Sequence, residues 1–356
     1  MKKTLEQIFL KMIELEASDL HWSQGGDIYF RINGMLYKYA EFTETIQNRV
    51  DFKALTKMLI GDREFDLFEK SKEFDGALTV LNQIRIRINV YYKQRKIAWA
   101  VRILPDRFFK LSELGISMDI CMQICELKQG LVLVTGATGS GKTTTLASLL
   151  NHINNHRSEH IFTIEDPVEY IHTPSNCLVS QREVGPDTDG FSKALKSILR
   201  EDPDIVLLGE MRDRESMDAA LTLSETGHLT FATLHTSGAV ETISRIISAF
   251  ESAEQDQIRE RLAGNLKFVI SQQLIPWNNG HGRSLCAEVM VSTKAIKAMI
   301  RDGKERQMRS TIETSYADGM ITMNKSLVEL MKQRKITARE AALYCNDKEA
   351  LLKLMG

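Results

Sequence analysis

The feature that most constrains this chain is a glycine-rich turn between an apolar run and a helical pattern. Residues 130–145 read GLVLVTGATGSGKTTT, in which Gly136 to Thr143 fits the pattern G-x-x-x-x-G-K-[ST]. Such a turn curls around phosphate oxygens with its backbone N–H groups pointing inward. The helix that follows adds the partial positive charge of its N-terminus. The pattern therefore predicts a phosphate-binding loop that joins a buried strand to a helix.

The residue types within this loop predict what it binds. Lys142 can place an ammonium group on the β- and γ-phosphates of a nucleotide, and the hydroxyl of Thr143 can bind Mg²⁺. ATP with Mg²⁺ is therefore the expected ligand. The expected nucleotide-binding residues of the loop are Gly136, Ala137, Thr138, Gly139, Ser140, Gly141, Lys142, Thr143 and Thr144. The competing interpretation is a plain glycine-rich turn with a solvated lysine.

Short apolar runs recur after residue 117 and alternate with helical stretches. They are apolar throughout, as strands buried on both faces of a parallel sheet are. Strands that alternate with helices predict an α/β fold with a parallel sheet covered on both sides. From about residue 293 the pattern becomes entirely helical. The runs cover residues 131–134, 161–164, 205–208 and 230–233.

The first 104 residues have a different pattern, which predicts a separate α+β domain. In the run 84–92, Arg85 and Arg87 alternate with isoleucines, so one face is apolar and the other basic. Asn33 and Gly34 form a turn signal. Residues 105–117 contain a proline and a glycine and are predicted to be a linker to a second domain over 118–356. Helices are expected over 1–16 and 50–70, and strands over 27–32, 34–39, 73–81, 84–92 and 97–104.

Acidic residues follow two of the predicted buried strands. Glu165, Asp166 and Glu169 come after one strand, and Glu210 and Asp213 after another. Hydrolysis needs a group that positions and deprotonates water, and the ends of parallel strands are where such groups are expected. A magnesium-binding strand usually ends in an aspartate, whereas here a glycine takes that place and Glu210 follows it. The competing interpretation of each cluster is a solvated loop at a strand end.

Two histidines bracket the predicted strand 229–233. His228 precedes it and His235 follows it. A histidine at a strand end can respond to a γ-phosphate or link the sheet to the site, although each taken alone is typical of a structural histidine. Neither has the cysteine or histidine spacing of a zinc site.

Composition narrows the class of protein further. The 356 residues exceed one ordinary core, and the 46 basic and 47 acidic residues give a net charge of -1, which does not indicate a nucleic-acid enzyme. No stretch approaches 18 apolar residues and the N-terminus is not a secretory signal, so a cytoplasmic protein without a membrane span is expected. Five cysteines without a C-x-x-C pair are expected to be buried thiols in a reducing compartment.

Taken together, the motifs resemble those of the secretion and pilus ATPase superfamily. The phosphate loop corresponds to its Walker A motif, residues 162–170 to its Asp box, residues 207–213 to its atypical Walker B motif and residues 227–235 to its His box. Residues 17–21, 85–89, 181–191 and 199–205 also resemble this family. The chain is most similar to the twitching-motility retraction ATPases of type IV pili.

The resemblance implies a fold, an assembly and roles for individual residues. It implies a PAS-like N-terminal domain joined to a RecA-like P-loop ATPase domain with a helical C-terminal region, assembled as a homo-hexamer, with nucleotide between the two domains of a subunit. Glu210 would be the catalytic carboxylate, Glu169 would position metal or water, and His235 would respond to the γ-phosphate, with His228 in the same motif. Thr143, Glu169 and Glu210 would hold Mg²⁺, partly through water. N-terminal arginines would reach the phosphates, and the candidates are Arg85, Arg87, Arg95 and Arg102.

The resemblance also implies partners and a direction of force. The partner would be an inner-membrane pilus platform protein, with a second retraction ATPase left open, and the chain would lie at the inner membrane through the pilus machine. Extension and secretion ATPases usually carry an extra N-terminal domain and a four-cysteine motif, which this sequence lacks, so retraction is favoured. Where retraction ATPases have Ala-Ile-Arg-Asn-Leu-Ile-Arg-Glu, residues 295–302 read Ala-Ile-Lys-Ala-Met-Ile-Arg-Asp, so Ala298 replaces an asparagine.

Three other functions stay open at this point. The first is a pilus-extension or type II secretion assembly ATPase of the same superfamily. The second is a RecA-like nucleic-acid motor, which would need a basic track with aromatic residues. The third is a nucleotide-gated binding module with little turnover.

Overall fold

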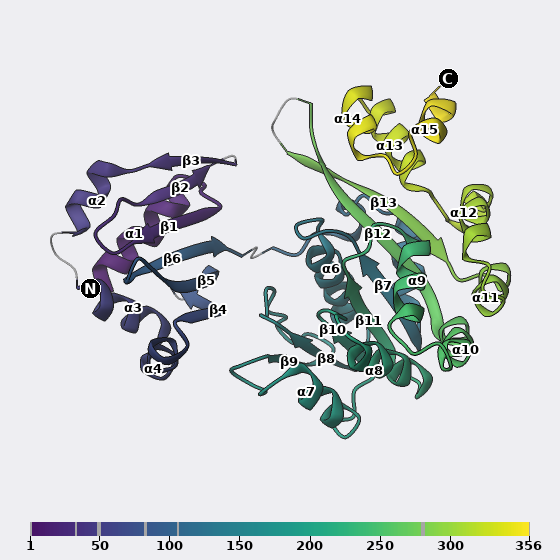
Figure 1. Cartoon of the computed structure of the whole chain (residues 1–356), viewed down its shortest axis with the longest axis horizontal. Coiled ribbons are helices and arrows are strands. Elements are labelled where there is room, and N and C mark those ends of the chain that lie inside the picture. The colour runs from purple at the N-terminus through teal and green to yellow at the C-terminus, as the bar shows by residue number, and fades with distance from the viewer. Residues whose placement is uncertain are drawn as a thin grey trace. The chain divides into compact units, whose positions relative to one another are not determined.

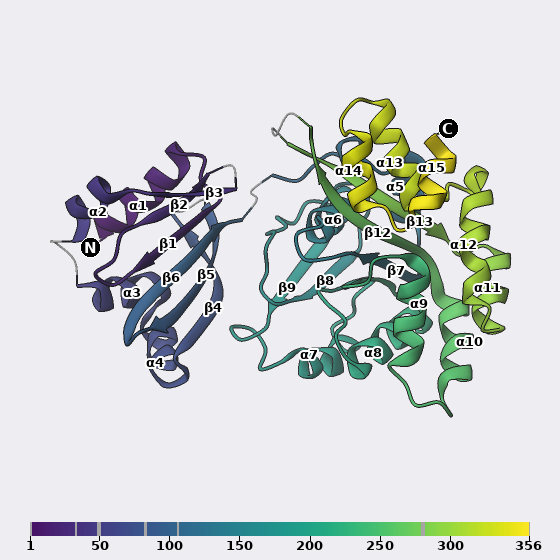
Figure 2. The same cartoon turned by 45° about the horizontal axis from the view of Figure 1, so that its top comes forward.

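The structure is a computed structural model that describes residues 2–32, 34–47, 51–81, 84–104, 107–278 and 282–355. The chain divides into two compact units. One unit comprises Met1–Arg107 with Pro167–Tyr170, and the other comprises Phe108–Asp166 with Ile171–Gly356. In Figures 1 and 2 the colour runs along the chain from purple at the N-terminus through teal and green to yellow at the C-terminus. Among the described residues, no helix is both long and apolar enough to cross a bilayer.

The described part of the N-terminal unit contains one six-stranded antiparallel sheet in the order β3-β2-β1-β6-β5-β4. Its strands are β1 (Asp19–Ser23), β2 (Tyr29–Ile32), β3 (Met35–Lys38), β4 (Glu73–Val80), β5 (Ile84–Lys93) and β6 (Lys96–Ile103). Its helices are α1 (Lys2–Glu14), α2 (Ala40–Gln47), α3 (Phe52–Ile60) and α4 (Asp62–Ser71). The helix predicted over 50–70 is thus broken in two at Gly61, whose φ of 96° no regular helix allows. The turn residue Asn33 lies outside the described residues.

Aromatic rings fill the centre of this unit. Trp99 on β6 is fully buried and packs edge-on against Trp22, with 5.5 Å between the ring centroids. Its ring also lies 4.8 Å from that of Phe52, and its Nε1 donates a hydrogen bond of 3.0 Å to Thr56 Oγ1. The indole is therefore satisfied both as an apolar surface and as a donor, as a buried tryptophan requires.

The described part of the second unit contains a seven-stranded sheet in the order β13-β12-β7-β11-β10-β8-β9. All neighbouring pairs are parallel except β12 and β13, which are antiparallel. Four of its strands contain the four apolar runs of the sequence, and the α/β fold class is confirmed. The strands are β7 (Gly130–Thr135), β8 (His160–Glu165), β9 (Leu178–Glu183), β10 (Ile205–Leu208), β11 (Leu229–Leu234), β12 (Leu266–Pro276) and β13 (Arg283–Val291).

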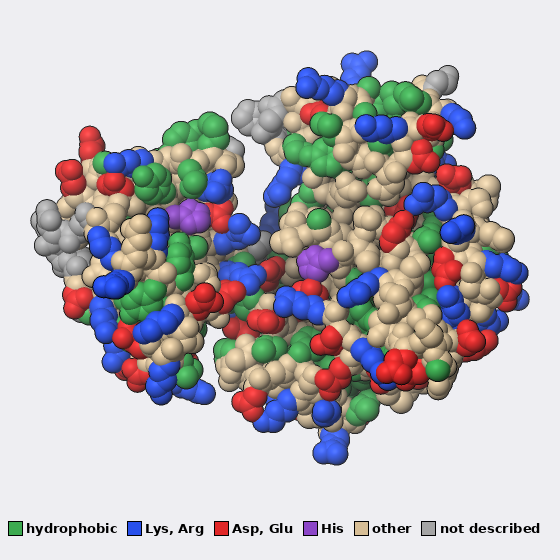
Figure 3. Space-filling model, in the orientation of Figure 1, with side chains coloured by type: hydrophobic (Ala, Val, Ile, Leu, Met, Phe, Trp, Pro, Cys, Tyr) green, Lys and Arg blue, Asp and Glu red, His purple; other side chains and the backbone are tan. Residues whose placement is uncertain are grey.

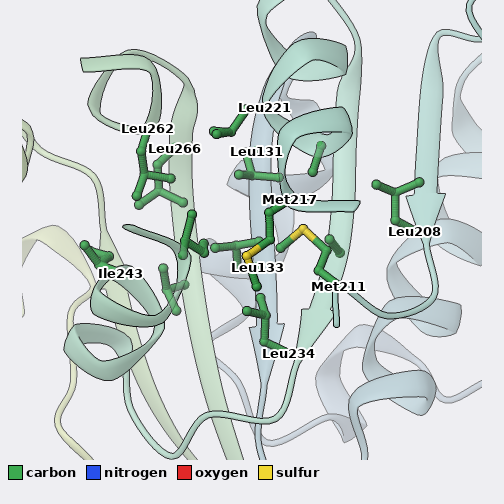
Figure 4. Close-up of a cluster of buried hydrophobic side chains, with 14 of the residues drawn as sticks. Leu131, Leu133, Leu208, Met211, Met217, Leu221, Leu234, Ile243, Leu262 and Leu266 are labelled. Atoms are coloured by element: carbon green, nitrogen blue, oxygen red, sulfur yellow. The ribbon is translucent and has the colours of Figure 1, made fainter. Parts of the chain in front are cut away.

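Helices cover both faces of this sheet because successive side chains of a strand point in opposite directions. On β7, Leu131 and Leu133 belong to one buried cluster, which includes Met217 and Leu262 from the helices of that face (Figure 4). The next residues, Val132 and Val134, belong to a second cluster on the other face. The first face carries α7 (Phe191–Ile198), α8 (Arg214–Glu225), α9 (Ala239–Ser248) and α10 (Gln255–Asn265), and the second carries α5 (Met118–Glu126) and α6 (Lys142–His156).

The region after β13 is helical, and the segment before α5 is packed. The C-terminal helices are α11 (Lys294–Arg301), α12 (Glu305–Thr314), α13 (Met323–Lys332), α14 (Ala338–Tyr344) and α15 (Lys348–Met355).

The segment before α5 was predicted to be a linker. Its residues 105–106 lie outside the described residues. Farther along, Leu111, Leu114 and Ile116 are buried in the core of the second unit. The prediction of a linker up to residue 117 is therefore wrong over this stretch, because its apolar side chains have a core to enter.

Replacing Trp99 by alanine should destabilise the N-terminal unit by about 3–5 kcal/mol, because it opens a large cavity in a packed aromatic cluster. Urea unfolding followed by circular dichroism measures the loss. Leu36→Ala is the control, since Leu36 on β3 is 49% exposed and should change the free energy of unfolding by less than about 0.5 kcal/mol. Equal losses in the two variants would contradict the central role of Trp99.

Candidate functional site

The glycine-rich loop leaves β7 with a backbone that only glycine can follow. Gly136 has a φ of 142°, and a Cβ atom there would lie 2.3 Å from the carbonyl oxygen of Gln272 on β12. Gly139 and Gly141 have φ values of 79° and 92°. The chain therefore bends sharply three times before α6 begins at Lys142, which is the curvature that a phosphate cradle needs.

Polar groups of the loop fit an anionic ligand. Lys142 Nζ donates hydrogen bonds to the carbonyl oxygens of Gly136 at 2.8 Å and Ala137 at 3.1 Å, so its ammonium lies within the curl. Ser140 is only 5% exposed, and in the described part of the chain its Oγ has no hydrogen-bond partner. A buried hydroxyl without a partner is unfavourable, and a bound phosphate group would supply an acceptor. Thr143 and Thr144, at the start of α6, are half-buried.

The ends of three neighbouring strands meet beside the loop. β7, β11 and β10 are adjacent and parallel, so their carboxyl ends share one edge of the sheet. The backbone N–H of Gly136 donates to Leu234 O at 3.3 Å, and the N–H of Met211 donates to Thr233 O at 2.9 Å. These bonds fasten the loop and the segment after β10 to the end of β11.

Glu210 and His235 are brought together at this edge. His235 Nε2 lies 3.1 Å from Glu210 Oε1, and Arg212 Nη2 lies 2.8 Å from Glu210 Oε2. Burial alone would raise the pKa of the Glu210 carboxyl, but Arg212 and His235 outweigh it and hold the pKa below its usual value. Glu210 is therefore an ionised carboxylate at neutral pH. His235 remains 42% exposed and faces this carboxylate rather than the core.

Gly209 explains why the acidic residue follows the strand end instead of occupying it. A Cβ atom at Gly209 would lie 3.0 Å from Ile164 O and 3.2 Å from Glu165 Cα on the neighbouring strand. An aspartate at this position would need that space for its side chain. The carboxylate is therefore one residue later, where it reaches Arg212 and His235.

The first acidic cluster divides into residues with different surroundings. Glu165 is buried at the end of β8 and accepts hydrogen bonds from Thr163 Oγ1 at 2.7 Å and Gln181 Nε2 at 3.2 Å, so it joins two strands. Asp166 is exposed. Glu169 is half-buried and lies in the segment that groups with the N-terminal unit, so its role at the site stays a prediction.

A magnesium ion at this edge would need oxygen atoms of water and phosphate in addition to those of the protein. Among the described residues, no group of three or more His, Cys, Asp or Glu side chains is arranged to hold a metal ion. Mg²⁺ commonly takes one or two protein oxygens and completes its shell with water and phosphate oxygens. The Thr143 hydroxyl and the Glu210 carboxylate fit that pattern, and the assignment of metal to Thr143, Glu169 and Glu210 stays a prediction.

His228 is not brought to this edge. It precedes β11, whereas His235 follows it, so the six-residue strand separates the two by about 20 Å. The ring Nδ1 of His228 instead lies 3.0 Å from both Leu223 O and Thr226 Oγ1 at the end of α8. This is the structural role that a lone histidine often has, and we leave His228 out of the proposed catalytic set.

The four candidate arginines all lie in the N-terminal unit. Arg87 Nη2 lies 2.8 Å from Asp75 Oδ2, and Arg102 Nε lies 2.7 Å from Asp19 Oδ1. Both guanidinium groups therefore have carboxylate partners within their own unit. Arg85 lies on β5, and Arg95 lies in the turn between β5 and β6 with a φ of 64°. A phosphate-binding role for any of the four stays a prediction.

Reasoning from the sequence did not predict a row of polar residues beneath the loop. Thr135 on β7, Ser271 on β12 and Glu288 on β13 lie opposite one another across three strands. Thr135 Oγ1 and Ser271 Oγ are 2.8 Å apart, and Gln272 Nε2 donates to Thr145 Oγ1 at 2.8 Å. The available signal was the polar triplet of residues 271–273 inside an otherwise apolar run.

Glu288 links this row to the segment that carries His235. Its side chain is only 8% exposed, and its Oε1 accepts a hydrogen bond of 2.8 Å from the backbone N–H of Ala239, the first residue of α9. Burial raises the pKa of the Glu288 carboxyl, against the lowering effect of this hydrogen bond. Glu288 therefore holds the start of α9, four residues after His235, although this requires burying a carboxyl group.

A parallel sheet with a glycine-rich phosphate loop, an ionised carboxylate and a histidine at one edge defines a RecA-like P-loop protein. Comparison with known proteins assigns the chain to a family within this class. Residues 1–279 match the family model described as Type II/IV secretion system protein, so the chain belongs to this family.

Similarity to individual relatives extends over nearly the whole chain. The chain is 41% identical over 325 residues to the Type IV pilus retractation ATPase PilT of Pseudomonas aeruginosa, covering 91% of this chain and 93% of the relative. It is 34% identical over 352 residues to the Type IV pilus ATPase PilU of the same organism, covering 98% and 91%. A crystal structure of the pilus retraction motor PilT with bound ADP superposes with a TM-score of 0.88 at 38% identity, over 98% of each chain. The resemblance drawn from the sequence motifs is confirmed.

Replacing Glu288 by glutamine should stabilise the second unit more at pH 8 than at pH 5. A folded-state pKa raised above the unfolded value of about 4.3 means that the carboxyl contributes stability at low pH, which is lost as pH rises through the folded pKa. Glutamine keeps the oxygen that accepts from Ala239 but cannot ionise. Urea unfolding of both proteins at the two pH values measures the difference, and a difference independent of pH would contradict this assignment.

Proposed function

We propose that this chain is a motor ATPase that hydrolyses ATP to power the retraction of type IV pili. The observation that carries the proposal is the pairing of an ionised Glu210 carboxylate with His235 at the sheet edge that also carries the phosphate loop. Family membership and the close similarity to pilus retraction ATPases over almost the full length support the same function.

The residues of this edge suggest how a phosphate bond would be broken. The loop N–H groups and Lys142 would bind the β- and γ-phosphates, which the positive end of α6 also favours. Glu210 would accept a proton from the attacking water, and His235 beside it would respond to the γ-phosphate. Mg²⁺, held by Thr143 and through water by Glu210 and Glu169, would neutralise charge on the phosphates.

The conversion of hydrolysis into movement is proposed to need several copies of the chain. We infer a homo-hexamer in which arginines of an N-terminal unit, from the same or a neighbouring copy, contact the bound phosphates. The candidates are Arg85, Arg87, Arg95 and Arg102. Loss of phosphate would remove these contacts and shift the units to a different arrangement, since a ligand shifts a conformational equilibrium by its differential affinity.

The motor is proposed to act at the cytoplasmic face of the inner membrane on a pilus platform protein. On the face drawn in Figure 3, Lys and Arg side chains are interspersed with Asp and Glu side chains, which does not favour the alternative of a nucleic-acid motor. Ala298, which replaces the asparagine of the retraction motif, is exposed on α11. The departure therefore changes a surface and not the core.

Glu210→Gln should leave ATP binding close to wild type and lower phosphate release by about 10²–10⁴-fold, because glutamine cannot accept the proton. A fluorescent ATP analogue measures binding, and a phosphate-release assay measures turnover. Lys142→Ala is the companion variant and should lose both binding and turnover. Normal turnover in Glu210→Gln would transfer the catalytic role to another carboxylate, with Glu169 the next candidate.

Deleting the gene in its host should give cells that carry more surface pili than wild type and do not twitch, because pili would extend without being retracted. Pilus counts by electron microscopy and twitching zones on agar measure this. Expression of the wild-type gene should restore twitching, and expression of the Glu210→Gln variant should not. Cells without pili would instead support the extension or secretion alternative.

A further inference from the structure

The far end of α6 carries a pair of histidines that the proposed reaction does not use. His152 and His156 are four residues apart, which on an α-helix places them on the same face about 6 Å apart along the axis. Their rings stack with 4.1 Å between centroids and 20° between planes. His152 is half-buried and His156 is exposed, so the pair is open to ions in solution.

One hydrogen bond determines which ring nitrogen of His156 is available. Nδ1 of His156 lies 2.7 Å from the carbonyl oxygen of His152, and a carbonyl can only accept, so Nδ1 carries the proton. The neutral ring therefore keeps its lone pair on Nε2, and His156 as a residue is exposed. A hydrogen bond from the second ring nitrogen to a backbone carbonyl is how proteins orient histidines that bind metals.

Within the described ranges, no third His, Cys, Asp or Glu side chain joins the two histidines in a group that could hold a metal ion. The next histidine along the chain, His160, has both ring nitrogens engaged, at 3.0 Å from Asp202 O and 2.9 Å from Ser180 Oγ. The nearby carboxylate of Glu159 pairs with Arg157 and with Lys128. Water would therefore complete the coordination of any ion bound by the two imidazoles.

We propose that His152 and His156 form a two-imidazole chelate for a divalent transition metal such as Zn²⁺, Ni²⁺ or Cu²⁺. Imidazole nitrogen suits these ions, whereas Mg²⁺ prefers oxygen. His152 lies ten residues beyond Lys142 on the same helix, about 15 Å along the axis. The ion therefore does not compete with the magnesium proposed for the nucleotide.

The site is tested by calorimetric titration of Ni²⁺ or Zn²⁺ into the full chain, without an affinity tag and without nucleotide, in excess Mg²⁺. One saturable binding event is expected for the wild type, and its loss is expected in His152→Gln and in His156→Gln. A matched control combines Asn151→His with His152→Asn. It keeps the number of histidines but places the two imidazoles five residues apart, about 140° around the helix, where they cannot share an ion. This control should also lose the binding event.

Imidazole NMR spectra of the ¹⁵N-labelled chain should show the resonances of the same two rings shifting on addition of Zn²⁺. A wild-type chain without saturable binding, or glutamine variants that retain it, would overturn the proposal. Circular dichroism melts identify any variant that has not folded, and the two single variants provide independent tests. The binding event does not depend on ATP turnover, so its outcome is separate from that of the proposed function.

Discussion

The contact between the end of β7 and its two neighbouring strands is the constraint on which the site depends. Gly136 donates its N–H to Leu234 O on β11 and leaves no room for a side chain against Gln272 O on β12. The loop therefore starts from a fixed position between two strands, and Lys142 can fold back onto its first carbonyls. Because the donors are in position before any ligand arrives, little reorganisation would accompany phosphate binding.

The same crowding explains the arrangement of the acidic side chain. At Gly209 the backbone of β8 approaches so closely that a Cβ would meet Ile164 O at 3.0 Å. The carboxylate is displaced to Glu210, where Arg212 and His235 stabilise its ionised form. The close spacing of the strands thus explains why a glycine takes the place of the usual strand-end aspartate. The acidic group is still found at the same edge of the sheet, one residue later.

The parts of the structure that sequence reasoning predicted correctly are those specified by neighbouring residues. The glycine-rich turn that leads into a helix and the four buried parallel strands each depend on a few consecutive side chains. The structural role of Glu288 depends instead on the order of the strands, in which β12 and β13 lie beside β7. This order brings Glu288 into one row with Thr135, which precedes it by more than 150 residues. Strand β1 was missed because Asp19, His21 and Ser23 make it look polar, while its pairing with β2 and β6 decides its conformation. His228 and His235 are close in sequence, yet a strand carries them to opposite edges of the sheet.

Helix α6 has opposite partial charges at its two ends, and each end carries groups that suit its charge. Its first turn faces the loop, where the N-terminal partial positive charge favours a phosphate anion. Its last turn carries His156, one turn beyond His152, where the C-terminal partial negative charge favours a cation. The helix packs into the core through Leu146, Leu149 and Ile153, and it therefore presents an anion-favouring end and a cation-favouring end. Since the core fixes the helix along its length, each end can hold a charged group without any cost in rearranging the other.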